Sequence, residues 1–201
     1  MKKIFTIILL LLCITNIKAY ENDIFNIDIP EGYELTNEET SYIWKNDNGY
    51  ISITISDNTQ TNYNIALYTK KDLENQKKYL DESFKKVEEE YDIDIVVSEI
   101  NKEKINDKYA LTYNVYWPSK DVIGKNTYQK GSVYSTEKYI VTLVYCSYDE
   151  IKDDDETYNK LLNSFNIKDE YLYDNRMIYI VIAVILGVIL GIVSYIKEKH
   201  K

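Results

Sequence analysis

Residue types that commonly carry catalysis are scarce in this 201-residue chain. Its single histidine is His200, next to the C-terminus, and its two cysteines are Cys13 and Cys146. Ser-His-Asp catalysis, Cys-His catalysis and histidine-based metal sites all need an imidazole beside the reacting group or the ion. The central part of the chain offers none. We therefore predict no catalytic residue, no bound cofactor and no metal site, and a protein that is not an enzyme.

Cys146 lies in an apolar segment between Tyr145 and Ser147. Because no base adjoins it in the sequence, we interpret it as a small core residue rather than a reactive thiol. Cys13 falls in the leader described below, so the mature chain keeps one thiol and forms no internal disulfide. An exported domain without a disulfide depends on its hydrophobic core for stability.

Acidic residues crowd residues 149–156, which read Asp-Glu-Ile-Lys-Asp-Asp-Asp-Glu. Carboxylates suit a hard cation such as calcium, but this run lacks the ligand spacing and the glycine of an EF-hand loop. Acids also cap helix N-termini and oppose the helix dipole, which is the interpretation we favour here. Two facing carboxylates could hydrolyse a glycoside. Among 33 Asp and Glu residues such a pair arises by chance, so a carboxylate-dependent hydrolase is the weakest hypothesis.

Residues 1–19 have the pattern of a secretory signal peptide. Lys2 and Lys3 precede an apolar run at residues 4–14, and Ala19 provides a cleavage site before Tyr20. An uncleaved anchor is the alternative. The acidic domain that follows contributes to a net charge of −9, which makes nucleic acid a poor partner.

Residues 177–196 carry no charge and predict one C-terminal transmembrane helix, about 30 Å long. The tail at residues 197–201 is basic, so we expect it in the cytoplasm and the preceding domain outside the membrane. Ala183, Gly187 and Gly191 recur at four-residue spacing, the pattern of a helix-pairing face. We predict a homodimer or a protein partner through this face, although glycine is also common in membrane helices.

The segment between the leader and the membrane helix predicts an α+β domain at residues 20–167, followed by a stalk at 168–176. Alternating apolar residues predict strands, and two stripes at helical spacing predict helices. Consecutive strands joined by short turns favour an antiparallel sheet with both helices packed on it. We expect strands at residues 24–30, 41–44, 50–56, 93–100, 109–117, 127–134 and 138–147, the last being central, and helices at 71–91 and 154–165.

Two short segments resemble PsbP-like (DcrB-like) domains. Residues 25–33, Phe-Asn-Ile-Asp-Ile-Pro-Glu-Gly-Tyr, are similar to the entry strand and turn of that family. Residues 161–167, Leu-Leu-Asn-Ser-Phe-Asn-Ile, are similar to its final helix and exit. The resemblance implies a binding or assembly scaffold rather than an enzyme, and it carries no catalytic residue. The predicted C-terminal membrane helix departs from the N-terminal lipid anchor of bacterial relatives.

Together these features predict a single-pass protein of a bacterial cell envelope, with a membrane-tethered extracytoplasmic binding or assembly module. A small-ligand or glycan sensor is the alternative, with Tyr116 and Trp117 as candidate contact residues. The 21 tyrosines leave open whether Tyr richness serves recognition or reflects coding bias.

Overall fold

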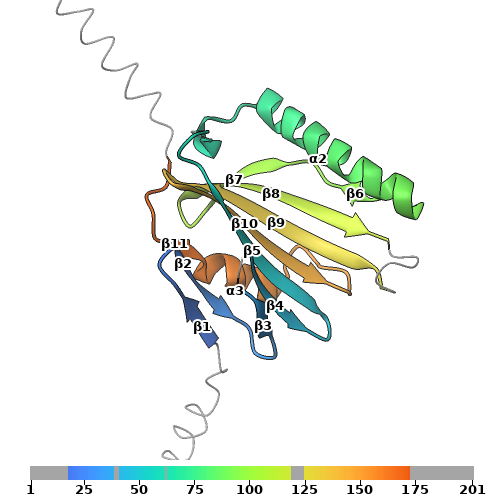
Figure 1. Ribbon diagram of the computed structural model, residues 1–201, viewed down its shortest axis with the longest axis horizontal. Helices are drawn as coiled ribbons and strands as arrows, with labels where there is room; N and C mark the ends of the chain where they lie inside the picture. Colours follow the sequence, from blue (N-terminus) through green and yellow to red (C-terminus); the bar gives the residue numbers. More distant parts are fainter. Residues whose placement is uncertain (1–17, 39–40, 62, 119–124, 173–201) are drawn as a thin grey trace, which may run out of the picture.

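The computed structural model describes residues 18–38, 41–61, 63–118 and 125–172 (Figure 1). Most of the predicted signal peptide, the predicted transmembrane helix with Ala183, Gly187 and Gly191, and the tail lie outside the described residues. Within the described ranges, no helix combines the length and the apolar character needed to cross a membrane.

Two antiparallel sheets form the domain. The larger follows the order β3-β4-β5-β10-β9-β8-β6, with β7 also pairing with β8, and the smaller follows β1-β2-β11. The strands of the large sheet are β3 (Glu34–Asn37), β4 (Ser41–Asn46), β5 (Gly49–Asp57), β6 (Val96–Val97), β7 (Asn101–Ile105), β8 (Lys108–Trp117), β9 (Thr127–Ser135) and β10 (Tyr139–Ser147). Those of the small sheet are β1 (Lys18–Glu21), β2 (Phe25–Ile29) and β11 (Asn166–Ile167). The helices are α2 (Lys70–Tyr91), α3 (Glu156–Ser164) and a short 3₁₀ helix, η1 (Ile65–Leu67). The predicted α+β class, with an antiparallel sheet and two helices, is confirmed.

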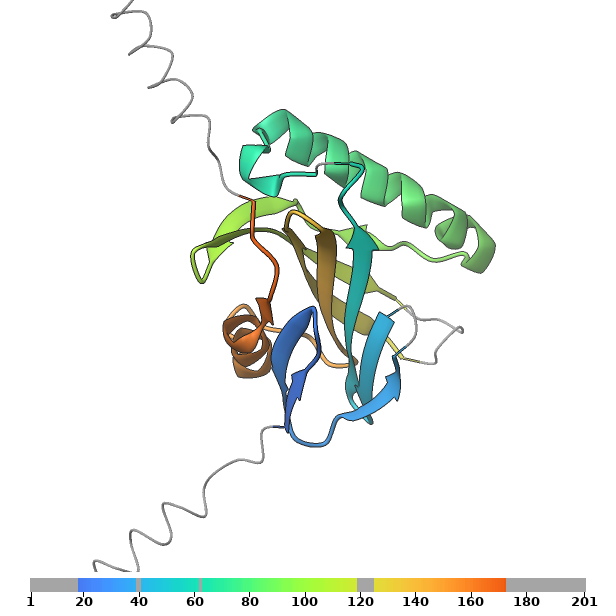
Figure 2. The ribbon, with the colours of Figure 1, turned by 60° about the vertical axis from the view of Figure 1, so that its left-hand side comes forward.

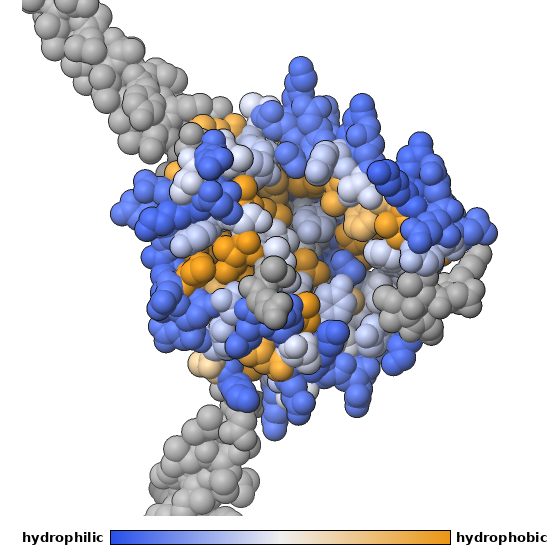
Figure 3. Space-filling view, viewed as in Figure 1, coloured by the Kyte–Doolittle hydropathy of each residue, from blue (hydrophilic) through white to orange (hydrophobic). Residues whose placement is uncertain are grey.

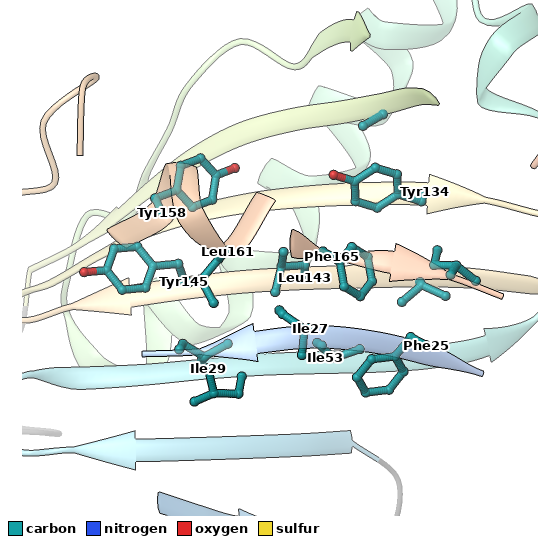
Figure 4. Packing of buried hydrophobic residues seen from close by; sticks show 14 of the residues in the cluster. Phe25, Ile27, Ile29, Ile53, Tyr134, Leu143, Tyr145, Tyr158, Leu161 and Phe165 are labelled. Atoms are coloured by element: carbon teal, nitrogen blue, oxygen red, sulfur yellow. The ribbon is translucent and has the colours of Figure 1, made fainter. Parts of the chain in front are cut away.

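The main core lies between the large sheet, the small sheet and α3 (Figure 4). Side chains alternate along each strand, so every second residue of β5 and β10 points into this core. Ile53 and Leu143 are fully buried there against Ile27 from the small sheet and Leu161 from α3. Burying each such side chain contributes about 1.5–3 kcal/mol. The predicted central strand, β10, does lie mid-sheet, between β5 and β9.

Helix α2 packs on the opposite face of the large sheet, near β8 and β6. Leu80, Phe84 and Val87 contact Val115 and its neighbours, as the helical stripe predicts. Tyr91, the last residue of α2, is exposed and adds nothing to this contact. In the orientation of Figure 1, hydrophobic side chains gather toward the middle of the visible face and hydrophilic ones surround them (Figure 3).

Five strands, including the two-residue β11, were missed or misplaced by the sequence patterns. Residues 93–100 were expected as one strand, but only β6 pairs with the sheet. Ile93, Ile95 and Val97 all pack beneath α2. Their alternation therefore reflects burial under the helix, not a strand that is hydrogen-bonded along its whole length. Strands β1, β3 and β7 are short and mostly exposed, and polar edge strands of this kind give little hydrophobic periodicity.

Both predicted boundaries of the domain shift. Lys18 and Ala19, assigned to the signal peptide, belong to β1 and pair with β2. Residues 168–172, assigned to the stalk, pack against the domain. Tyr171 is 8% exposed and forms a bridge with Thr136, and the Lys168 amide donates to the Ile24 carbonyl at 2.7 Å. The ordered domain therefore extends through Leu172, because buried contacts beyond β11 hold these residues.

Candidate binding cleft

A polar cleft lies beside α3, on the face of β8 and β9 that also carries the main core. It consists of two adjoining hollows of about 340 and 270 Å³ that share Ser98, Asn114 and Lys130. Strand β8 contributes Thr112, Asn114 and Tyr116, and β9 contributes Tyr128 and Lys130. These residues line one side because alternate side chains of a strand point to the same face.

The floor of the cleft is held by satisfied polar contacts. Lys130 is 8% exposed, and its Nζ donates to the Lys152 carbonyl at 2.7 Å. The same atom lies 3.8 Å from Asp153 Oδ1 and 5.4 Å from the centre of the Tyr158 ring. The Tyr158 hydroxyl in turn bonds to Ser132 Oγ at 2.8 Å. Burial raises the pKa of Tyr158, while the Ser132 hydrogen bond acts against it, so the phenol is neutral at physiological pH.

The rim of the cleft differs from its floor. Five polar side chains converge there from β7, β8 and α3: Asn101, Glu103, Thr112, Asn114 and Asn159. Across the part of the chain that the structure describes, none of these side chains makes a hydrogen bond or an ion pair with protein. They are thus solvated donors and acceptors around a rigid floor, available to a ligand without breaking an internal contact.

An aromatic pair marks the open end of the cleft. Tyr116 and Tyr128 are cross-strand partners, and their ring centres lie 4.9 Å apart at an interplanar angle of 36°. Val96 and Ile151 add apolar surface beside them, and Glu150 brings a carboxylate to the same hollow. Partial desolvation raises the pKa of Tyr128, and the neighbouring Tyr116 and Glu150 raise it further.

The two contact residues proposed from sequence separate in the structure. Tyr116 lines the cleft, whereas Trp117 packs on the opposite face against Phe84, with ring centres 6.0 Å apart. Adjacent residues of a strand point to opposite faces, so they cannot line one groove. The role of Tyr116 as a contact residue stays a prediction that its position allows, and the prediction is wrong for Trp117. The sequence signal that could have found Thr112 and Asn114 is strand alternation. In β8 they share the face of Tyr116 and interleave with the apolar residues that point to the other face.

The acidic run and the thiol have structural roles. The Asp155 side chain accepts a hydrogen bond from the Tyr158 amide at 2.8 Å, which confirms the predicted cap of α3. In the described ranges, no three His, Cys, Asp or Glu side chains are grouped to hold a metal ion. Cys146 is fully buried, and burial raises the pKa of its thiol to about 11, which confirms it as a core residue.

Comparison with known proteins bears on the fold. No family model matches this chain, and no curated protein matches it either. The solution structure of cyanobacterial PsbP (CyanoP) from Synechocystis is similar, with a TM-score of 0.54 and 12% sequence identity over 77% of this chain and 94% of that one. A crystal structure from Bacteroides thetaiotaomicron gives a TM-score of 0.45 at 12% identity, over 73% of this chain. This chain covers 46% of that protein's length. The fold is PsbP-like, as the two sequence segments predict.

Proposed function

We propose that this chain is a non-enzymatic, membrane-tethered binding or assembly module of a bacterial cell envelope, and that its partner binds in the cleft. One observation carries the proposal: five solvated polar side chains converge over a floor that is already fixed by its own hydrogen bonds. Because the floor is already fixed, only the rim side chains lose conformational freedom on binding. The PsbP-like fold supports a scaffold of this type.

The positions of the two domain ends support a single anchor. Lys18 lies beside Ile29 at one end of β2, and Ile167 lies beside Phe25 at the other. These ends are separated by about 13 Å along β2. The segment after Ile167 then runs further from Lys18, up to Leu172 (Figures 1 and 2). A C-terminal anchor after the stalk needs no contact between the Lys18 end and the membrane. A single C-terminal anchor is therefore enough to tether the domain.

The same geometry leaves the cleft accessible in a tethered protein. The Leu172 amide donates to the Ser135 carbonyl, at the end of β9 nearest the anchor. Tyr128 lies seven residues back along β9, or about 23 Å. The aromatic end of the cleft therefore points away from the anchored end of the domain.

A small-ligand or glycan sensor is the second candidate. It is favoured by the half-buried Tyr116–Tyr128 pair that lines the cleft next to amide side chains, because sugars stack on aromatic rings and bond to amides. A free ligand that saturates the cleft at micromolar concentration without a protein partner would favour this function over assembly.

Cross-linking in the native membrane tests the leading proposal. The full-length protein is cross-linked mildly and purified beside two variants, Asn114→Arg in the cleft and Gly187→Leu/Gly191→Leu in the predicted membrane helix. Asn75→Arg on the exposed side of α2 is the matched control. We expect a specific partner that is lost in Asn114→Arg and retained in the control. Loss only in the double glycine variant would place association in the membrane helix instead. A defined catalytic turnover by the purified protein would contradict the non-enzymatic role.

A further inference from the structure

The open end of the cleft combines aromatic faces with negative charge. The Tyr116 and Tyr128 rings are tilted by 36° with centres 4.9 Å apart, and both residues line a 270 Å³ hollow. Aromatic faces carry negative electrostatic potential and attract cations, most strongly where water is partly excluded. Val96 and Ile151 add apolar surface to the same hollow.

The charges around the cleft reinforce this preference. Glu103 and Glu150 have no ion-pair partner among the described residues. Lys130 is the cation in the lining, but its Nζ is directed to the Lys152 carbonyl and Asp153 on the floor. Its charge is therefore partly compensated locally, and the cleft as a whole keeps an excess of carboxylates. The chain's net charge of −9 adds a long-range attraction for cations.

We propose that the aromatic end of the cleft binds an organic cation, an alkylammonium group seated between the Tyr116–Tyr128 faces and the Glu150 carboxylate. This inference rests on the proposed function, because it assigns a ligand class to the same cleft. The ammonium meets ring faces on one side and the carboxylate on the other, while its alkyl substituents contact Val96 and Ile151. An anion is disfavoured by Glu150, and a neutral sugar gains nothing from that charge.

Titration calorimetry on the full chain, in a non-ionic detergent without choline headgroups, tests the ligand class. Choline is compared with its neutral isostere, 3,3-dimethylbutan-1-ol, and with a neutral trisaccharide of N-acetylglucosamine. A Gly-Lys-Gly peptide with an acetylated N-terminus and an amidated C-terminus, and its Nε-acetylated form, show whether the cation is better recognised on a peptide than on a small molecule. We expect each cation to bind roughly tenfold more tightly than its neutral counterpart, and more weakly as salt concentration rises.

Variants assign the effect to the site. We expect Glu150→Gln and Tyr128→Leu each to weaken choline binding roughly tenfold. Glu90→Gln and Tyr79→Leu, matched changes on exposed positions of α2, should leave it unchanged. Unaltered thermal unfolding midpoints would show that the variants remain folded.

The outcomes separate the inference from the proposed function. Equal affinity for choline and its isostere, or full affinity in Glu150→Gln, overturns the cation assignment. If the trisaccharide binds instead, and Asn114→Arg abolishes that binding, the cleft is a binding site but its ligand is neutral. If no probe binds and cross-linking is indifferent to Asn114→Arg, both the inference and the cleft's proposed role fail.

Discussion

Asn58 joins two loops through a fully buried side chain. Its Nδ2 donates to the Tyr63 carbonyl at 3.0 Å and the Thr136 carbonyl at 2.7 Å. Its Oδ1 accepts from Thr61 Oγ1 at 2.8 Å and from the Tyr63 amide at 2.7 Å. One amide thus satisfies two donors and two acceptors, and it ties the loop after β5 to the turn between β9 and β10.

Replacing Asn58 with Asp keeps the shape and removes both donors. An ionised carboxylate would then face the Tyr63 and Thr136 carbonyl oxygens, and each unsatisfied buried group costs about 1–3 kcal/mol. We expect Asn58→Asp to lower the free energy of unfolding by about 2–4 kcal/mol at pH 8. A protonated carboxyl regains one donor, so the folded state raises the pKa of the new side chain above the unfolded value of about 3.9. The folded state then binds the proton more tightly, and stability falls as pH rises, by about 1.4 kcal/mol per pH unit between the two pKa values.

Urea unfolding of the full chain at pH 4.5 and pH 8 measures this effect. The chain's two tryptophans, Trp44 and Trp117, both lie in the domain, so their fluorescence reports its unfolding. Asn75→Asp, an exposed change on α2 with the same charge difference, should stay within about 0.5 kcal/mol of the wild type. Wild-type stability of Asn58→Asp at pH 8, or an equal loss at both pH values, would refute the assigned hydrogen bonds.

Three further changes test other parts of the fold. Gly131→Ala would place a Cβ 2.3 Å from Tyr113 Cζ, so we expect a loss of about 1–3 kcal/mol; an unchanged urea midpoint would contradict that packing. Burial opposes ionisation of Asp169, but hydrogen bonds, first that from the Lys138 amide, outweigh it and lower its pKa. Its ionised carboxylate therefore stabilises the fold above the unfolded pKa of about 3.9. The difference in unfolding free energy between the wild type and Asp169→Asn should vanish as pH falls through the folded pKa. A difference that does not change between pH 2 and pH 7 would argue against this. Burial raises the pKa of Cys146 to about 11, so its alkylation by iodoacetamide at pH 8 should be roughly a hundredfold slower in the folded than in the urea-unfolded chain; equal rates would show an exposed thiol.

Elements with strong hydrophobic periodicity could be predicted from sequence. Strand β10 is the most apolar segment of the domain, and it is central because β5 and β9 flank it while its inward side chains meet the core. The stripe of α2 likewise predicts its contact with β8. Local pattern suffices in these cases, because burial on one face determines both the period and the orientation.

The cleft depends on information that local pattern does not hold. Its rim joins Glu103 and Asn114, from the paired strands β7 and β8, to Asn159 of α3, which lies much further along the chain and reaches them only through strand register and helix placement. Strand β7 has almost no apolar residues, so nothing in its sequence distinguishes it from a loop. Of the residues that line the site, only Tyr116 was named from the sequence, because an aromatic residue on a strand is a candidate contact without knowledge of its partners.

Site-specific photo-cross-linking in intact cells tests the central claim that the cleft is where this protein meets its partner. A benzophenone amino acid is placed at Tyr116 in the cleft and, in a separate strain, at Tyr79 on the exposed side of α2. The account predicts a discrete cross-linked product from position 116 and none from position 79. Identical products from both positions, or a product only from position 79, would contradict it.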